Sequence, residues 1–301
     1  MNMEKNFKIL VITVASSNSK VGSNTWTSLL KDYDSENVAN VCIREEIPDS
    51  KVCSRYFCIS ENKVLKSIFK RKIKTGCEVI PEIQEDSEDL NIHKERYKQM
   101  KKNRRYSMLL ARELVWKLGK WKTKELDTFL DSFKPDIILH SMDGYIHLNR
   151  VIQYAIKRTG AKSVGYIWDD NFTYKQHNSF GYKFYRFFQR KSLKKLASIT
   201  QEFFAITPKT KKEADEFFGI NSVLLTKPLN AVPKVSDGEP NNPLKMLYTG
   251  NLQIGRDRSL EKVSKGLDEV NKDSVKIVLD VYTNTYIDDD KKAEIDSPYC
   301  K

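Results

Sequence analysis

The feature that most constrains this chain is a regular alternation of strand-like and helix-like segments through its middle. Short apolar stretches rich in β-branched and aromatic residues recur there, and a stretch with helical periodicity separates each from the next. The strand-like stretches are Ile137–His140, Ser163–Trp168, Phe203–Thr207 and Ser222–Lys227. Such alternation is typical of parallel strands joined by helices that cover the sheet. The sequence therefore predicts an α/β fold.

The N-terminal part fits the same class. Lys8–Val14 (KILVITV) is a nearly continuous β-branched run, as expected of a buried parallel strand, and the polar loop after it contains Gly22. Val38–Arg44 is a second strand candidate. We expect a helix over Ser60–Lys74 and a long helical tract over Ile92–Phe133.

A change of composition divides the chain. Ala231–Pro243 is rich in Pro, Asn and Gly, which is typical of a linker. Beyond it we expect a strand at Lys245–Thr249, a loop at Gly250–Arg256, a helix at Ser259–Val270 and a strand at Val275–Tyr282. We therefore expect a Rossmann-like domain at residues 1–231, a linker at 232–242 and a partial second Rossmann-like domain at 243–301.

The charge is unevenly distributed. The chain carries 52 Lys+Arg against 40 Asp+Glu, a formal net charge of +12. One basic run spans residues 63–124, and a second, Tyr182–Lys195, carries six basic residues and no acidic one. Nucleic acid, an anionic membrane surface and a phosphorylated small molecule all fit, as does a plain solvated helix face. No zinc-finger spacing, aromatic RNA-binding motif or GxxG clamp supports nucleic acid.

The pattern within these runs favours a membrane surface. Val64, Leu65, Ile68, Phe69 and Ile73 would share one face of a helix whose remainder is basic. No apolar run approaches the roughly 20 residues of a spanning helix, and no secretory leader is evident. We therefore expect a cytoplasmic protein that binds the inner membrane face peripherally.

Cysteine and histidine spacing gives no sign of a metal site. The five cysteines form no CxxC pair, which favours reduced thiols over a disulfide framework. His93, His147 and His177 lack the spacing of metal ligands.

The order of motifs resembles glycosyltransferases of the GT-B fold, specifically family 4, which includes bacterial capsule and exopolysaccharide enzymes. The motifs are KILVITVASSNSKVGSNTWTSLL, KPDIILHSMDG, VGYIWDDNF, AITPKTKKEADEFFGINSVLLTKPLN and LKMLYTGNLQIGRDRSLEKV. Each is weak alone, but all five occur in the family's order. The resemblance implies an acceptor domain first, a nucleotide-sugar donor domain second, and a retaining reaction.

The resemblance also implies an acceptor site in the first domain. His140 and Asp143 follow a strand at the edge where such sheets bind ligands, and they are the catalytic candidates. Gly22, Asp169 and Asp170 are the acceptor-binding candidates. Two alternatives stay open: His140 as a hydrogen-bonded structural residue, and the Asp pair as a helix cap.

The donor candidates are Gly250, Asn251, Gly255 and Arg256. The glycines would let the backbone approach a diphosphate, and Arg256 would bind its oxygens, so no metal or other cofactor is expected. An ordinary loop with a surface arginine is the alternative. The chain departs from the family in two ways: Asn251 stands in place of the usual Arg, and the chain ends before the family's late acidic Glu-x7-Glu motif.

The sequence thus predicts an enzyme that moves a sugar from a nucleotide sugar to a saccharide or lipid-linked saccharide during surface polysaccharide assembly. The alternative is an inactive remnant or interaction subunit that needs a partner chain to complete the donor domain. Nucleic-acid binding is a weaker third possibility.

Overall fold

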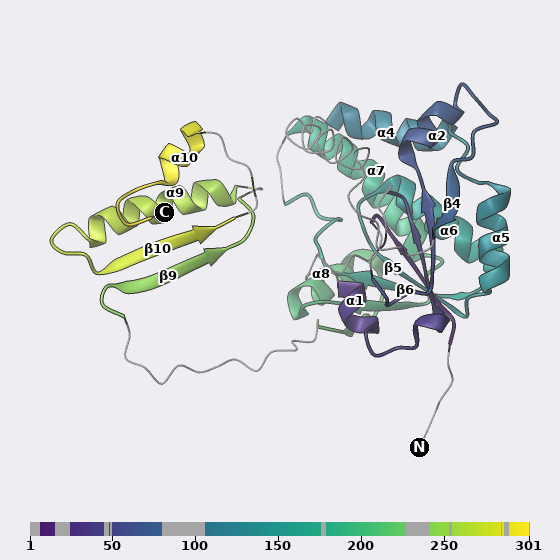
Figure 1. Cartoon of the computed structure of the whole chain (residues 1–301), viewed down its shortest axis with the longest axis horizontal. Helices are drawn as coiled ribbons and strands as arrows, with labels where there is room; N and C mark the ends of the chain where they lie inside the picture. The colour runs from purple at the N-terminus through teal and green to yellow at the C-terminus, as the bar shows by residue number, and fades with distance from the viewer. Residues whose placement is uncertain are drawn as a thin grey trace, which may run out of the picture. The chain divides into compact units, whose positions relative to one another are not determined.

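The chain forms two compact units, Met1–Asn230 and Ala231–Lys301 (Figure 1). The computed structural model describes residues 7–15, 25–44, 48, 50–79, 106–175, 179–226, 241–252, 255–283, 285 and 289–300. Gly22, the basic residues between 80 and 105, and most of the expected linker lie outside these ranges.

Unit 1 is built on an eight-stranded sheet in the order β4-β3-β2-β1-β5-β6-β7-β8 (Figure 1). All neighbouring strands are parallel except β3 and β4. The strands are β1 (Ile9–Thr13), β2 (Val38–Cys42), β3 (Arg55–Ile59), β4 (Gly76–Val79), β5 (Ile137–Ser141), β6 (Lys162–Ile167), β7 (Glu202–Ala205) and β8 (Val223–Leu224).

The centre of the sheet explains the β-branched run near the N-terminus. Ile9 pairs with Val38 on one side and with Ile137 on the other. From β1 the chain moves outward through β2 and β3, and it later returns to the opposite side of β1 as β5. The order of strands therefore reverses between β1 and β5, the kind of position where open α/β sheets bind ligands at the carboxyl ends of their strands.

Helices bury both faces of this sheet. They are α1 (Thr25–Leu30), α2 (Glu61–Ser67), α4 (Tyr106–Leu118), α5 (Lys124–Phe133), α6 (Ile146–Thr159), α7 (Phe180–Ala197) and α8 (Pro208–Phe218), with a 3-10 turn at Ser35–Asn37. The larger core lies on the face covered by α4 to α8 and includes Trp116, Phe129 and Ile152. Trp26 of α1 and Tyr56 belong to the smaller core on the other face.

The expected helix over Ser60–Lys74 is wrong beyond Ser67. The Ser67 hydroxyl donates to the Val64 carbonyl and accepts from the Lys120 amide at 2.8 Å, which ties the end of α2 to the end of α4. The chain then turns into β4, which pairs with β3. Val64 is buried, whereas Leu65 of the same helix and Phe69 beyond its end are exposed, so these residues do not share one apolar face.

The expected tract over Ile92–Phe133 is two helices where the structure describes it. A Cβ at Gly119 would lie 2.7 Å from the Val64 carbonyl oxygen and 2.9 Å from that of Val115, so only glycine fits where α4 ends. Thr123 then caps α5 by accepting the Leu126 amide at 3.3 Å.

Unit 2 is a single strand–helix–strand unit followed by a short helix. It comprises β9 (Leu244–Thr249), α9 (Arg256–Val270), β10 (Ile277–Tyr282) and α10 (Asp289–Ile295). The two strands are parallel, with Leu244 opposite Ile277. Leu260 and Leu267 of α9 pack with Leu279 in the core of this unit.

The α/β class is confirmed, as is a Rossmann-like first unit followed by a smaller second α/β unit. None of the helices in the described ranges has the length and apolar character to span a bilayer. The five cysteines are free thiols. Within those ranges no cluster of His, Cys, Asp and Glu is arranged to hold a metal ion.

Candidate functional site

Asp143 lies just beyond the end of β5, beside the point where the strand order reverses. The Ser141 hydroxyl donates to its Oδ2 at 2.5 Å, and the Trp168 indole N–H donates to its Oδ1 at 3.2 Å. Burial raises the pKa of the Asp143 carboxyl, the charge of Asp169 adds to the rise, and the two hydrogen bonds oppose it. Asp143 is thus a positioned carboxyl group at the edge of the sheet where open α/β folds generally bind ligands.

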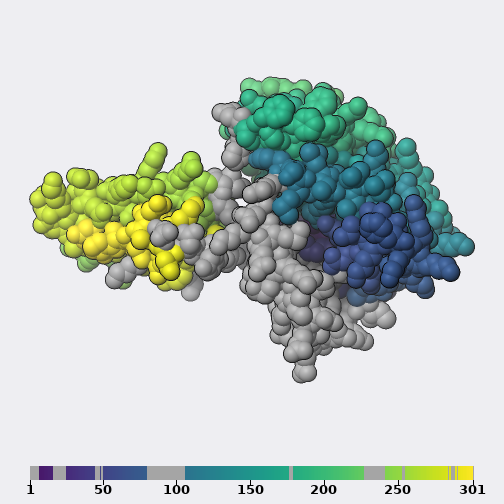
Figure 2. Space-filling model, turned by 90° about the horizontal axis from the view of Figure 1, so that it is seen from above, coloured from purple at the N-terminus to yellow at the C-terminus, as the bar shows by residue number. Residues whose placement is uncertain are grey.

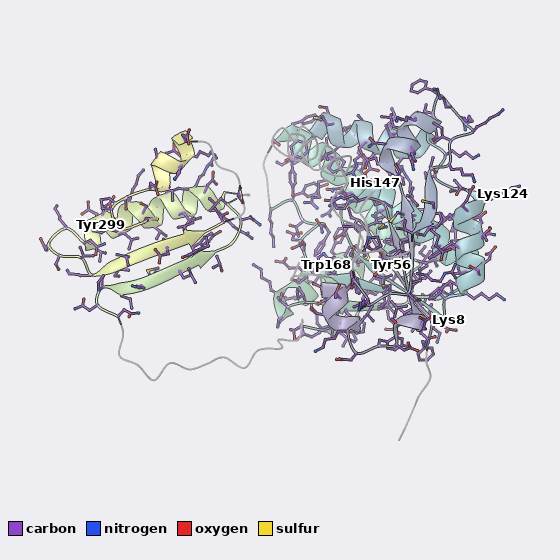
Figure 3. All side chains as sticks on the ribbon, in the orientation of Figure 1. Lys8, Tyr56, Lys124, His147, Trp168 and Tyr299 are labelled. Carbon is purple, nitrogen blue, oxygen red and sulfur yellow. The ribbon has the colours of Figure 1, made fainter. Side chains whose placement is uncertain are left out.

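Aromatic rings support this edge from the end of β6. The Trp168 ring packs edge-on against Trp26 of α1 at 5.4 Å and against Tyr166 at 5.3 Å between centroids (Figure 3 marks Trp168). The Tyr166 hydroxyl donates to the Leu225 carbonyl at 2.6 Å. Rings fixed in this way hold the indole N–H in place for Asp143. Asp169 follows Trp168 and is exposed, so it can reach a ligand at the same edge.

His140 lies within β5 and is completely buried. Its Nδ1 is 3.4 Å from the Ser141 carbonyl oxygen, and its Nε2 is 3.4 Å from the Thr200 hydroxyl. Burial lowers the pKa of His140 to about 4, so its imidazole is neutral at pH 7. The structure therefore favours a structural role for His140 over the catalytic role expected from the sequence.

Asp170 organises the turn after β6. Its carboxylate accepts the Thr173 amide at 2.8 Å and the Phe172 amide at 3.3 Å, and it also accepts the Thr173 hydroxyl. This is a side-chain-capped turn, close to the capping alternative left open by the sequence. Of the acceptor candidates, Asp169 thus lies near Asp143. The Asp170 carboxylate is occupied by the turn after β6. Gly22 lies outside the described residues.

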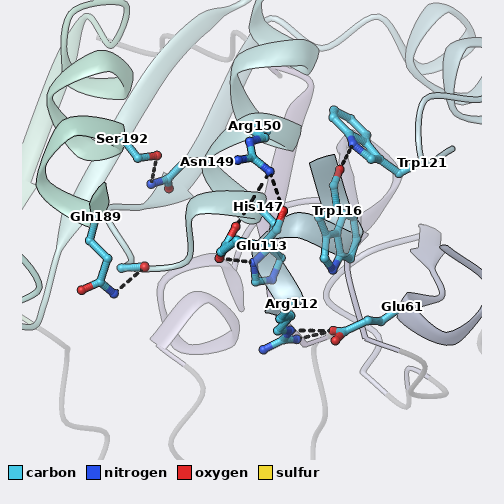
Figure 4. Close-up of polar contacts among 11 residues, drawn as sticks. Glu61, Arg112, Glu113, Trp116, Trp121, His147, Asn149, Arg150, Gln189 and Ser192 are labelled. Carbon is cyan, nitrogen blue, oxygen red and sulfur yellow. Dashed lines mark hydrogen bonds and ion pairs between the residues drawn. The ribbon is translucent and has the colours of Figure 1, made fainter. Parts of the chain in front are cut away.

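Sequence reasoning missed a buried acid–base pair between α4 and α6 (Figure 4). Glu113 Oε1 lies 2.8 Å from His147 Nδ1, and both side chains are buried. The Trp116 ring stacks on the imidazole at 5.1 Å, and Arg150 donates to the Glu113 carbonyl oxygen at 3.2 Å. Burial lowers the pKa of His147, and the Glu113 carboxylate opposes that shift.

This pair is closed off from solvent and joins two helices, so its contribution is to stability. Among the described residues, His147 Nε2 has no hydrogen-bond partner. No local motif could have revealed the pair, because Glu113 and His147 are 34 positions apart. The only hint in the sequence is that both residues sit in apolar helical stretches.

The four donor candidates come together at the start of α9. Gly255 adopts φ +80°, caps the helix, and makes Arg256 its first residue. The helix thus begins before the expected Ser259, and Arg256 belongs to it and not to a loop. The Arg256 Nη1 donates to the Asn251 side-chain oxygen at 3.0 Å, and Gly250 joins this turn to the end of β9.

The start of α9 can attract an anion. Helix N-termini carry unpaired amides and a partial positive charge, and a guanidinium adds bidentate donors. Gly255 has no side chain to cap the helix, but the Asp257 amide donates to the Leu252 carbonyl at 3.3 Å and the Asp257 carboxylate accepts the Arg258 amide. Asp257 in the first turn is paired with Lys291 at 2.6 Å, which offsets its charge.

No protein-family model matches the sequence, and no curated protein matches it. Several solved structures are distantly similar. MnaA of S. aureus, in a co-structure with UDP, is 12% identical, with a TM-score of 0.42 and coverage of 98% of this chain and 68% of that one. UDP-GlcNAc 2-epimerase of Neisseria meningitidis bound to UDP-GlcNAc is 12% identical, with a TM-score of 0.43 and coverage of 95% and 68%.

The glycotransferase of kitacinnamycin is 9% identical, with a TM-score of 0.40 and coverage of 98% of this chain and 70% of that one. Likenesses of this size carry no argument about the chemistry of this chain.

Proposed function

We propose that this chain is a glycosyltransferase of GT-B type, family 4-like, in which unit 2 binds a nucleotide sugar and the carboxyl edge of the unit 1 sheet binds the acceptor. The proposed acceptor is a saccharide or lipid-linked saccharide of surface polysaccharide assembly. The observation that carries the proposal is Arg256, which follows a left-handed glycine at the first position of α9 and is held by Asn251.

The donor site would act on the leaving group. Negative charge develops on the nucleoside diphosphate as the bond to the sugar breaks. Arg256 and the positive end of the α9 helix dipole would stabilise that charge, and Gly255 would let the phosphates approach the backbone. Because the chain's own cations supply this stabilisation, we propose that the reaction needs no metal. The retaining outcome rests on the family resemblance.

The acceptor site would use carboxylates. Asp143, held by Ser141 and Trp168, would orient an acceptor hydroxyl, and the exposed Asp169 would accept hydrogen bonds from neighbouring sugar hydroxyls. Fixed partners matter here because a misplaced reacting group loses much of the rate gained from orientation.

The decisive experiment measures nucleotide binding. Isothermal titration of the full chain with UDP and with GDP should show binding of one of them. Arg256→Ala should weaken that binding about 10- to 100-fold, the effect of losing hydrogen bonds to a charged group. Lys262→Ala removes the same charge from an exposed site farther along α9 and should leave the affinity unchanged. Equal losses in the two variants, or no binding of either nucleotide, would contradict the donor site.

A second candidate is an interaction subunit that binds a partner chain through unit 2. The exposed apolar side chains Leu244, Met246 and Leu247 of β9 favour it. The two candidates differ in one measurement, the release of free nucleotide from UDP- or GDP-sugars by the purified chain. Release that depends on Arg256 supports the enzyme, and nucleotide release only after a partner protein is added supports the subunit.

A further inference from the structure

Exposed apolar side chains of unit 1 gather on three neighbouring helices. Of the thirteen large apolar side chains that are exposed in its described part, nine lie on α7, on α4, or on α2 and the turn after it. These helices are in contact, α4 with both α2 and α7. Figure 2 looks onto this surface, which we call the α2–α4–α7 face.

The α7 helix carries the largest share. Phe180, Phe184, Phe187 and Phe188 are exposed, with Phe180 at 84% and Phe187 at 57%. Their rings pack in series. The ring centroid of Phe180 lies 6.2 Å from that of Phe184, and the centroid of Phe188 lies 5.1 Å from that of Phe184 and 5.5 Å from that of Phe187. The result is one continuous aromatic strip on the outside of the helix.

The opposite side of α7 is also apolar. Tyr185, Leu193 and Leu196 are buried against the rest of unit 1. A helix that is apolar on both sides is ordinarily covered on both, and a large exposed apolar patch marks an interaction site. The outer strip of α7 is therefore exposed and does not fill the core.

The same face is strongly cationic. Lys183, Lys191, Lys194 and Lys195 are exposed on α7, and α2 and α4 add further exposed lysines. These three helices, which are described throughout, carry only two carboxylates. Glu113 is buried, and Arg112 binds Glu61. No exposed carboxylate on the three helices opposes an anionic partner.

We propose that the α2–α4–α7 face docks on an anionic lipid bilayer. An α-helix of 18 residues is about 27 Å long and can lie in the headgroup layer, its apolar side chains in the acyl boundary and its lysines at the phosphates. This proposal rests on the surface alone and does not depend on the donor site.

The mixture of side chains favours a bilayer over the alternatives. Aromatic rings could stack on bases, but the exposed Leu114 and Leu118 of α4 cannot. An acidic protein partner would be complementary in charge to the lysines, but it would also have to supply apolar contacts to the exposed side chains of all three helices. A bilayer offers anionic headgroups and apolar chains together over a wide surface.

The test is sedimentation of the full chain with vesicles of phosphatidylcholine alone and with vesicles that also contain the anionic lipid phosphatidylglycerol. We expect binding to the anionic vesicles only, weakened by salt because exposed charges are screened. Phe184→Ser with Phe187→Ser should weaken binding at least about 10-fold. Lys191→Glu with Lys194→Glu should weaken it by at least about 10-fold as well.

The matched control is Lys157→Glu with Lys162→Glu, which reverses two exposed charges outside the face and should bind as the wild type does. Circular dichroism establishes that each variant is folded. The proposal is overturned by equal binding to neutral vesicles, by no binding to anionic ones, or by equal losses in the control. It is also overturned if the chain is a dimer that the phenylalanine variant converts to monomer, since a second copy would then occupy the face.

Discussion

The buried histidine within β5 leads to a testable prediction about stability in acid. His140 is completely buried, and burial lowers its pKa to about 4. In the unfolded chain the imidazole titrates near its ordinary pKa of about 6.5. Below that pH the unfolded chain takes up a proton that the folded chain does not, so the free energy of unfolding falls as the pH falls.

The size of the effect follows from the two pKa values. A difference of about 2.5 units limits the loss to about 3 kcal/mol, reached near pH 4. Between pH 7.5 and pH 5 the loss from His140 alone is about 2 kcal/mol. His147 also has a lowered pKa and acts in the same direction, whereas carboxylates with lowered pKa values, such as Asp215, act mainly below this window.

Comparison with His140→Gln isolates this contribution. Glutamine cannot be protonated, and its amide can bond to the Ser141 carbonyl and the Thr200 hydroxyl. Urea unfolding followed by tryptophan fluorescence reports on unit 1 alone, because all four tryptophans (Trp26, Trp116, Trp121 and Trp168) belong to it. We expect the wild type to lose about 2 kcal/mol more than the variant between pH 7.5 and pH 5.

Two results would refute this reasoning. One is an identical pH dependence in the wild type and the variant. The other needs no variant: the NMR titration of the His140 ring in the folded wild type should show no protonation above about pH 5, and a pKa near 6.5 would mean that burial does not act as described.

Two further substitutions probe the packing of unit 1. Gly119→Ala should destabilise it by about 3 kcal/mol or more in the same unfolding assay, because the added Cβ meets the backbone of Val64. Gly160→Ala should destabilise it by only about 1 kcal/mol, because nothing lies within 4 Å of the added Cβ and only the φ of +68° is unfavourable. Glu113→Ala should lower the free energy of unfolding by about 2 to 4 kcal/mol, because it leaves His147 Nδ1 buried without a partner. As a control, Glu216→Ala at an exposed position should stay within about 0.5 kcal/mol of the wild type. Equal effects of the two substitutions would show that the buried pair does not stabilise the fold.

Most strands of unit 1 were predictable because they are short apolar runs bounded by polar residues, but β3 and β4 were not predicted. The expected strand at Ile137–His140 is confirmed as Ile137–Ser141, and that at Ser163–Trp168 as Lys162–Ile167. The helix opened by Pro208 begins at that residue, where Thr207 caps it. In these cases the pattern of neighbouring residues is sufficient to predict the element that the fold contains.

The sequence does not reveal the contacts between distant segments. The end of α2 depends on the Ser67 hydroxyl meeting the Lys120 amide, 53 positions away, and the break after α4 depends on the Val64 backbone. The pairing of Glu113 with His147 has the same character. Helical periodicity continues through residues 68–74, so it favours a longer helix until these contacts are known.

The site residues show why small errors in element boundaries matter for function. His140 and Asp143 are only three positions apart, and residue type alone would make either a candidate. In a parallel sheet covered on both faces, however, a residue of a central strand can be completely buried, as His140 is, whereas Asp143 beyond the strand is only partly buried and its carboxylate reaches Ser141 and Trp168. His140 pairs within β5, and Asp143 lies past it. Arg256 shows the converse. The helix begins three residues earlier than expected, so a cation expected in a loop is the first residue of a helix, where its charge adds to the positive end of the helix dipole. The access and electrostatics of a candidate residue at the end of a strand or helix thus depend on where that element ends, which distant contacts decide.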